Sequence, residues 1–218
     1  MALLIRLLSC YISSENLRNP EHKTGETFML VALEGSSPTI FGENNYKYYV
    51  WQAYLVTKES NSIYVPGPAA ISISTSGINI AKMADKACSY IRGHSGKVSL
   101  IGWSRGAAAC IQVAHNLKGT SNKIDAMFLF DAVDQDTSTN SDLNFIPDSV
   151  TNVYHAIATK KSWMDRQIFP TCGKQAANGV SLNKRHFHTS HGGVAGAGDD
   201  DAGSKLWMWD KLRIEGVL

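Results

Sequence analysis

The stretch from Val98 to Leu117 constrains the fold of this chain more than any other part of it. A short apolar run, Val98 to Ile101, stops at Gly102-Trp103-Ser104-Arg105-Gly106, and a helix-forming segment follows at once. This order predicts a buried strand, a tight turn and a helix, the setting in which a G-x-S-x-G pattern exposes a serine hydroxyl at the end of a sheet. Glycine on both sides of the serine suits a turn with no room for side chains and with unusual backbone angles. The sequence therefore predicts Ser104 as a nucleophile.

Apolar runs and helical patterns alternate along most of the chain. Strands are predicted at Phe28–Leu33, Ser62–Val65, Met127–Phe130 and Thr151–Ala158, and helices within Asn45–Glu59, Ile78–Arg92 and Lys205–Leu212. The N-terminal run Met1–Tyr11 reads as a strand or a packed segment, and Thr171–Gly203, rich in Gly, Asn and Asp, reads as long loops. Alternating strands and helices predict an α/β fold, a mostly parallel sheet with helices on both faces. Its ligand site is expected beyond the carboxyl ends of the strands.

Composition narrows the class of protein. The length of 218 residues suits one α/β domain over 1–218. Lys+Arg of 21 against Asp+Glu of 19 gives a dispersed net charge of +2, which predicts no nucleic-acid partner. The four cysteines form no C-x-x-C pair, so no metal site is expected; Cys88 and Cys110 are predicted to be buried thiols, and a Cys10–Cys172 bridge is left open. The acidic run Asp199–Asp201 is interpreted as a solvated loop and not as a calcium site.

A serine nucleophile needs an imidazole base and a carboxylate that orients it. The acid candidates, which all follow Ser104, are Asp131, Asp134, Asp142 and Asp165. Asp131 is favoured because it ends an apolar strand. His115 lies in the helix after the nucleophile and His155 lies within a strand, so the base candidates are the loop histidines His186, His188 and His191. His191 is favoured because the glycines that follow it allow the ring to reach back over the sheet.

Two backbone amides are predicted to stabilise an oxyanion. In this architecture one comes from the residue after the nucleophile, here Arg105, and the other from the loop after an early strand. Gly35 or Ser36 fits the second position, and Gly35 is the preferred candidate. Such a mechanism needs no metal or cofactor.

Several short motifs resemble the DUF2235 family of α/β-hydrolase domains, which includes the Tle1-like phospholipase effectors of bacterial type VI secretion. The matching segments, in family order over about half of the chain, are Gly102–Ala107, Phe128–Val133, Tyr154–Ala156, Asp165–Pro170, Phe187–Gly193 and Trp207–Met208. The resemblance implies a minimal α/β-hydrolase fold with Ser104 as nucleophile, Asp131 as acid and His191 as base. Glu34-Gly35-Ser36 departs from the Asp-Gly-Thr with which the family opens, and glycines follow His191 where Ser-Asp-Val is usual.

These observations predict a serine hydrolase of carboxylic esters, with the resemblance implying a lipase or phospholipase that acts on acyl lipids. Trp163, Met164, Trp207 and Trp209 are candidates for an apolar rim, although packing explains them equally well. The alternatives are a non-catalytic α/β-hydrolase-like binding module and a small-ester esterase. No membrane-spanning stretch or signal peptide is predicted, so synthesis in the cytoplasm is expected. Export without a signal peptide, with a secretion or immunity protein as partner, is what the family resemblance implies.

Overall fold

A fully parallel sheet forms the centre of the molecule. The computed structural model describes residues 27–36, 47–57, 61–68, 79–135, 138–160, 170–198 and 200–218. Six strands lie in the order β2-β1-β3-β4-β6-β8, and all neighbouring pairs are parallel. Their bounds are β1 Phe28–Leu33, β2 Ile63–Val65, β3 Lys97–Trp103, β4 Ile124–Phe130, β6 Val150–Ala158 and β8 Ser181–Phe187. A small second sheet pairs β5, Phe145–Ile146, with β7, Gln175–Ala176.

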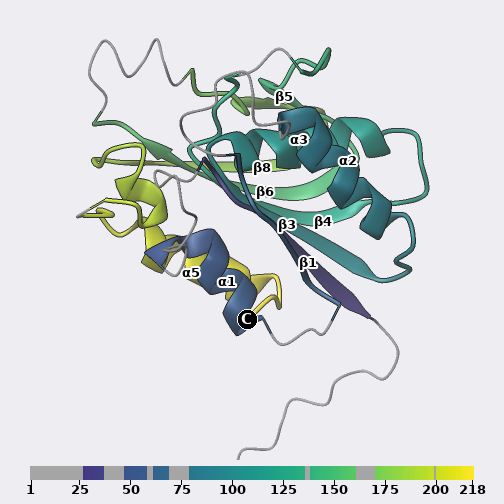
Figure 1. Ribbon diagram of the computed structural model, residues 1–218, viewed down its shortest axis with the longest axis horizontal. Coiled ribbons are helices and arrows are strands. Elements are labelled where there is room, and N and C mark those ends of the chain that lie inside the picture. The colour runs from purple at the N-terminus through teal and green to yellow at the C-terminus, as the bar shows by residue number, and fades with distance from the viewer. Residues whose placement is uncertain are drawn as a thin grey trace, which may run out of the picture.

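Helices cover both faces of the large sheet (Figure 1). The helices are α1 Tyr49–Val56, α2 Ile80–Ile91, α3 Arg105–Leu117 and α5 Ser204–Ile214, with a short 3₁₀ turn, η2, at Gly193–Ala195. Helices α2 and α3 pack together on one face, and α1 and α5 lie on the other. Side chains of β1 alternate between the two cores: Val31 and Leu33 face α2 and α3, while Leu30 and Ala32 face the opposite side. Burial on both faces explains why the central strands are continuously apolar.

The predicted α/β class and parallel sheet are confirmed, but one strand of the large sheet and the two short strands β5 and β7 were missed. Ser181–Phe187, predicted as part of a long loop, is the edge strand β8 and pairs with β6. Five of its seven residues are exposed, including Lys184 and Arg185, so its sequence lacks the apolar run that marks a buried strand. The predicted N-terminal strand, Met1–Tyr11, lies outside the described residues.

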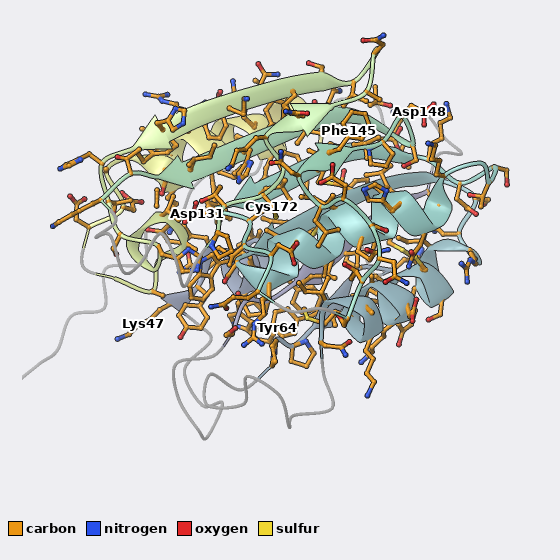
Figure 2. All side chains as sticks on the ribbon, turned by 90° about the horizontal axis from the view of Figure 1, so that it is seen from above. Lys47, Tyr64, Asp131, Phe145, Asp148 and Cys172 are labelled. Atoms are coloured by element: carbon orange, nitrogen blue, oxygen red, sulfur yellow. The ribbon has the colours of Figure 1, made fainter. Side chains whose placement is uncertain are left out.

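The parallel arrangement collects the carboxyl ends of the strands at one edge of the sheet. Figure 2 shows Asp131, which follows β4, far from Asp148, which precedes β6 at the opposite edge. Ser104 follows β3, and Glu34 to Ser36 follow β1, so these segments belong to the same edge as Asp131. The fold therefore brings the predicted site residues to the sheet edge where such folds place their ligands.

Candidate active site

Ser104 lies on a strained turn between β3 and α3. Its backbone angles, φ 55° and ψ −124°, are rare for a residue other than glycine. A Cβ atom on Gly102 would lie 2.6 Å from the Gly106 carbonyl oxygen, and one on Gly106 would lie 2.1 Å from that of Leu33. The turn is thus so tight that any side chain at either glycine would displace backbone. Its geometry is held in part by a hydrogen bond from the Ser104 amide to the Phe130 carbonyl, 3.0 Å long.

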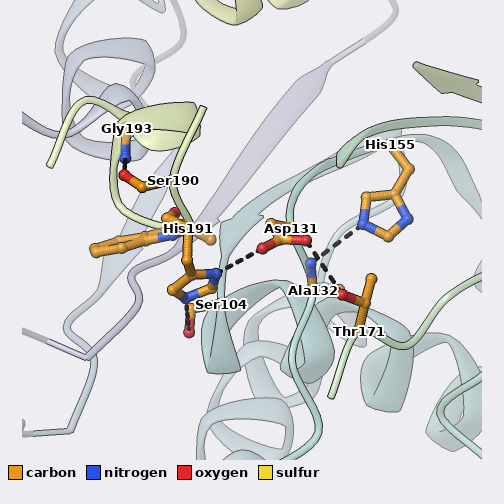
Figure 3. A network of polar contacts seen from close by, with 9 residues as sticks. Ser104, Asp131, Ala132, His155, Thr171, Ser190, His191 and Gly193 are labelled. Carbon is orange, nitrogen blue, oxygen red and sulfur yellow. Dashed lines mark hydrogen bonds and ion pairs between the residues drawn. The ribbon is translucent and has the colours of Figure 1, made fainter. Parts of the chain in front are cut away.

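A continuous hydrogen-bond chain joins the serine, a histidine and a carboxylate (Figure 3). The Ser104 hydroxyl oxygen lies 2.9 Å from His191 Nε2, and His191 Nδ1 lies 2.7 Å from Asp131 Oδ2. An ionised carboxylate only accepts hydrogen bonds, so the proton of the neutral ring belongs on Nδ1 and leaves Nε2 to accept from the serine. The structure thus brings together the three residues predicted as nucleophile, acid and base, in the arrangement that activates a hydroxyl.

Asp131 is completely buried where β4 ends, and its backbone is also strained, with φ 40°. Its amide donates to the Ala156 carbonyl of β6 at 2.7 Å, and the Thr171 hydroxyl donates to its second carboxylate oxygen, Oδ1, at 3.4 Å. One carboxylate oxygen thus faces His191 and the other faces Thr171. The contacts from the neighbouring strand and segment hold the carboxylate against the imidazole.

A second histidine, His155 of β6, binds the backbone of Ala132, the residue after Asp131 (Figure 3). It is fully buried; its Nε2 accepts from the Ala132 amide at 3.1 Å, and its Nδ1 lies 3.1 Å from the Gly173 carbonyl oxygen. An amide can only donate and a carbonyl can only accept, so these contacts require a neutral ring with its proton on Nδ1. The sequence placed His155 in a strand but gave no sign of this role, because the partners are backbone atoms from two other segments.

The backbone of His191 is held by the residue that precedes the nucleophile. Trp103 donates its indole N–H to the His191 carbonyl at 3.1 Å, and the two rings lie 5.7 Å apart. After the histidine, the Gly193 amide donates to the Ser190 hydroxyl at 3.0 Å as the chain enters η2. The His191 side chain remains 14% exposed, so its ring is partly open to solvent, whereas the Asp131 side chain is fully buried.

The predicted oxyanion residues lie on adjacent segments, the start of α3 and the loop after β1. Arg105 begins α3, and its side chain Nε donates to the Ser36 hydroxyl at 2.7 Å. The Gly35 amide donates to Oε1 of the preceding Glu34 at 3.0 Å. The second predicted oxyanion donor is therefore already engaged by a carboxyl group of its own loop. That contact depends on a side chain folding back on its neighbour, and no spacing in the sequence signals it.

Four of the alternative acid and base candidates, Asp142, His115, His186 and His188, have other contacts or lie exposed in the described part of the chain. Asp142 accepts from the Asn144 amide at 3.0 Å, His115 contacts backbone carbonyls of the β5 region, and His186 and His188 are exposed. The backbone amide of Asp134 donates to the Pro170 carbonyl. Asp165 lies outside the described residues, as do Trp163 and Met164.

The cysteines that the structure describes are buried thiols. Cys88, Cys110 and Cys172 are free and buried, and burial raises the pKa of the Cys110 and Cys172 thiols. Thiols that remain protonated are poor nucleophiles. Cys10 lies outside the described residues, but Cys172 is a free thiol, so the structure does not contain the Cys10–Cys172 bridge that the sequence left open. No group of three or more His, Cys, Asp or Glu side chains in the described part of the chain could hold a metal ion.

The C-terminal aromatic residues pack within the fold. Trp207 contacts the rings of Tyr154 and Phe187, and Trp209 contacts Tyr49. Packing therefore accounts for both tryptophans that were candidates for an apolar rim. Within the described ranges, no helix has the length and apolar character needed to cross a membrane.

Comparison with solved structures identifies the fold. The NocB thioesterase domain, solved as a covalent complex with a fluorophosphonate nocardicin G analogue, superposes with a TM-score of 0.50 at 13% identity over 88% of this chain and 95% of its own. A YdeN-like hydrolase from Pectobacterium atrosepticum gives 0.47 at 13% identity over 88% and 90%, and Aspergillus fumigatus lipase B gives 0.46 at 11% over 76% and 45%. No family model and no curated protein matches the chain. The chain has the α/β-hydrolase fold.

Proposed function

We propose that this protein is a serine hydrolase that cleaves carboxylic esters through an acyl-enzyme on Ser104. The observation that carries the proposal is the hydrogen-bond chain from Ser104 through His191 to Asp131, built on a strained turn at the carboxyl edge of the sheet. Strain of this kind persists only where surrounding structure enforces it, and it clusters at functional sites. The α/β-hydrolase fold is compatible with this chemistry but does not by itself establish it.

The mechanism follows from the direction of each hydrogen bond. As Ser104 Oγ attacks the acyl carbonyl carbon, its proton passes to His191 Nε2, and Asp131 stabilises the imidazolium that forms. Collapse of the tetrahedral intermediate breaks the ester C–O bond, and His191 returns the proton to the leaving alkoxide. Water then repeats these steps on the acyl-enzyme, releasing the carboxylic acid and restoring Ser104. We assign the oxyanion to the backbone amides of Arg105 and the Gly35–Ser36 loop.

We further propose acyl lipids as substrates. The motif resemblance to the DUF2235 family suggests this class, and exposed apolar side chains on α1 and α5 are compatible with contact to a lipid surface. Those side chains are Leu55 and Val56 on α1 and Leu206 and Ile214 on α5. A secretion or immunity partner, implied by the same resemblance, belongs to this proposal as well.

Labelling with a fluorophosphonate probe tests the nucleophile without knowledge of the substrate. Mass spectrometry should find the adduct on the peptide containing Ser104, and the adduct should disappear in Ser104→Ala and His191→Ala. Ser99→Ala removes another buried hydroxyl, from the strand β3 that precedes Ser104, and should label like the wild type. Absence of an adduct in folded protein would contradict the proposal and favour a non-catalytic binding module.

A panel of acyl esters of increasing chain length then tests the substrate class. Turnover that rises toward long acyl chains and increases on phospholipid vesicles would support a lipase. Turnover confined to acetyl and butyryl esters would replace the lipid proposal with a small-ester esterase. Ser104→Ala should lower turnover on any accepted ester by about three orders of magnitude or more.

A further inference from the structure

Glu34 places a buried carboxyl group directly beside the proposed oxyanion site. It follows the last residue of β1 and is 1% exposed. Its Oε1 accepts from the Gly35 amide at 3.0 Å, and its Oε2 accepts from the Tyr64 hydroxyl of β2 at 3.2 Å. The amide that we assign to the oxyanion is thus already bound to an acidic side chain.

Close backbone packing confines this loop on three sides. A Cβ atom on Gly67 would lie 1.9 Å from the Gly35 carbonyl oxygen, and one on Gly106 would lie 2.5 Å from that of Glu34. A Cβ atom on Gly35 itself would lie 2.6 Å from the ring of Trp103. The backbone around Gly35 is therefore closely packed, and the Glu34 carboxyl group lies directly against the Gly35 amide.

The groups around the carboxyl come from several elements. Tyr64 reaches it from β2, the Trp51 backbone from the first turn of α1, and Tyr48 precedes that helix. Arg105 of α3 binds Ser36, two residues beyond Glu34. Burial raises the pKa of Glu34 from its ordinary 4.5 to about 7, although hydrogen bonds from Gly35, Tyr64 and Trp51 act in the opposite direction. Burial and the charge of Glu34 also raise the pKa of Tyr48.

We propose that Glu34 is a positioning residue of the oxyanion loop and that only its neutral form permits full hydrolytic activity, an inference that rests on the proposed function. As a carboxylate, Glu34 binds the Gly35 amide through a charge-assisted hydrogen bond and places a negative charge near the oxygen that becomes an anion in the transition state. Protonation removes the charge and weakens its hold on the amide. Oε2 can then donate to Tyr64, so the loop keeps its contacts in either state.

This arrangement predicts a bell-shaped dependence of kcat on pH. The acid limb reports deprotonation of the histidine base, as in any enzyme of this type. The alkaline limb reports ionisation of Glu34. A site that depends on the histidine alone would instead reach a plateau.

The test is the pH profile of kcat and KM for a soluble acyl ester between about pH 6 and 9. Wild-type kcat should fall by about tenfold or more from pH 7 to 9, because each pH unit above the pKa reduces the neutral fraction about tenfold. Glu34→Gln mimics the neutral acid and keeps an oxygen for the Gly35 amide, so its kcat should stay level over this range. KM should change little in either protein.

Tyr64→Phe is the matched variant, and it keeps the test decisive if Glu34→Gln does not fold. It removes a hydrogen bond that lowers the pKa of Glu34, so the alkaline limb should persist but move to higher pH. A level wild-type profile, or an alkaline limb that is unchanged in Glu34→Gln or in Tyr64→Phe, would overturn the inference. Fluorophosphonate labelling separates the two proposals: no adduct on Ser104 at any pH contradicts the hydrolase itself, whereas equal labelling from pH 7 to 9 contradicts only the role of Glu34.

Discussion

The proposed acid end of the site, at Asp131, and the proposed oxyanion end, at Glu34 and Gly35, flank the same serine but are held by contacts of different kinds. Asp131 is held by its backbone bond to β6 and by Thr171, and His155 binds the backbone amide of the next residue, Ala132. The oxyanion loop is fixed through Glu34, whose carboxyl has a pKa raised by burial to about 7. The comparison teaches that one site can be held by backbone and hydroxyl contacts on one side of its serine and by a buried carboxyl group on the other.

Asp131→Asn should break the acid end and have the largest effect. Asparagine tolerates the positive φ of this position, so the fold should survive. Without the negative charge the histidine loses its orientation and its stabilised cation, and kcat should fall by about 10³- to 10⁴-fold. Steady-state kinetics beside circular dichroism measure both effects. Asp134→Asn, in the same segment, should retain activity; the reverse pattern would reassign the acid.

His155→Phe should break the contacts to the backbone of Ala132, next to the acid. The substitution leaves the Ala132 amide and the Gly173 carbonyl buried without their present partner, and each such group costs about 1–3 kcal/mol. We expect the free energy of unfolding in urea to fall by about 4 kcal/mol. The matched variant His186→Phe, on the exposed edge strand, should change it by less than about 0.5 kcal/mol. Equal losses of unfolding free energy at the two positions would show that the buried hydrogen bonds of His155 do not stabilise the fold.

Glu34→Gln should sharpen the comparison by removing the pH response of the oxyanion end. The folded-state pKa of Glu34 lies above its ordinary value of 4.5, so this group stabilises the fold fully below about pH 4.5 and loses that contribution as pH rises through about 7. A shift of this size corresponds to about 3 kcal/mol. Urea unfolding at several pH values should show the wild type losing stability over this window relative to Glu34→Gln. If the free energy of unfolding changed with pH equally in the wild type and in Glu34→Gln, the pKa of Glu34 would be ordinary.

Trp103→Phe should have the smallest effect on kcat. It changes only the contact that holds the backbone of His191, the proposed base. The change keeps an aromatic ring against Gly35 but removes the hydrogen bond to the His191 carbonyl. One neutral hydrogen bond contributes about 1 kcal/mol, so kcat should fall about fivefold. A pH profile that keeps its shape would separate this positioning effect from that of Glu34.

Local patterns in the sequence were sufficient to predict the parallel sheet and the strand-turn-helix around Ser104. Buried parallel strands are apolar without interruption, and a tight turn needs glycine, so both leave a clear trace in the residues. The edge strand β8 has no such pattern in its sequence, because most of its residues are exposed and exposed positions accept polar side chains. The sequence excluded His155 as a base because it lies within a strand. It could not show that His155 binds the Ala132 amide and the Gly173 carbonyl.

The oxyanion end was the least predictable part of the site for a related reason. A glutamate before a glycine is common in loops and carries no signal of burial. Only the folded chain shows that Gly67, Gly106 and Trp103 enclose the loop and leave the carboxyl group without solvent. Long-range packing, which sequence spacing does not encode, determines the ionisation of this side chain.

The two edges of the sheet have a consequence for self-association. An open edge strand offers unpaired amides and carbonyls to another chain, which is a common route to aggregation. Here one edge, β2, is only three residues long, and the other, β8, carries exposed Lys184 and Arg185. A second copy that approached β8 in register would meet like charges before it could form a ladder. The polarity that hid β8 from sequence analysis therefore also protects the sheet from growing beyond its own chain.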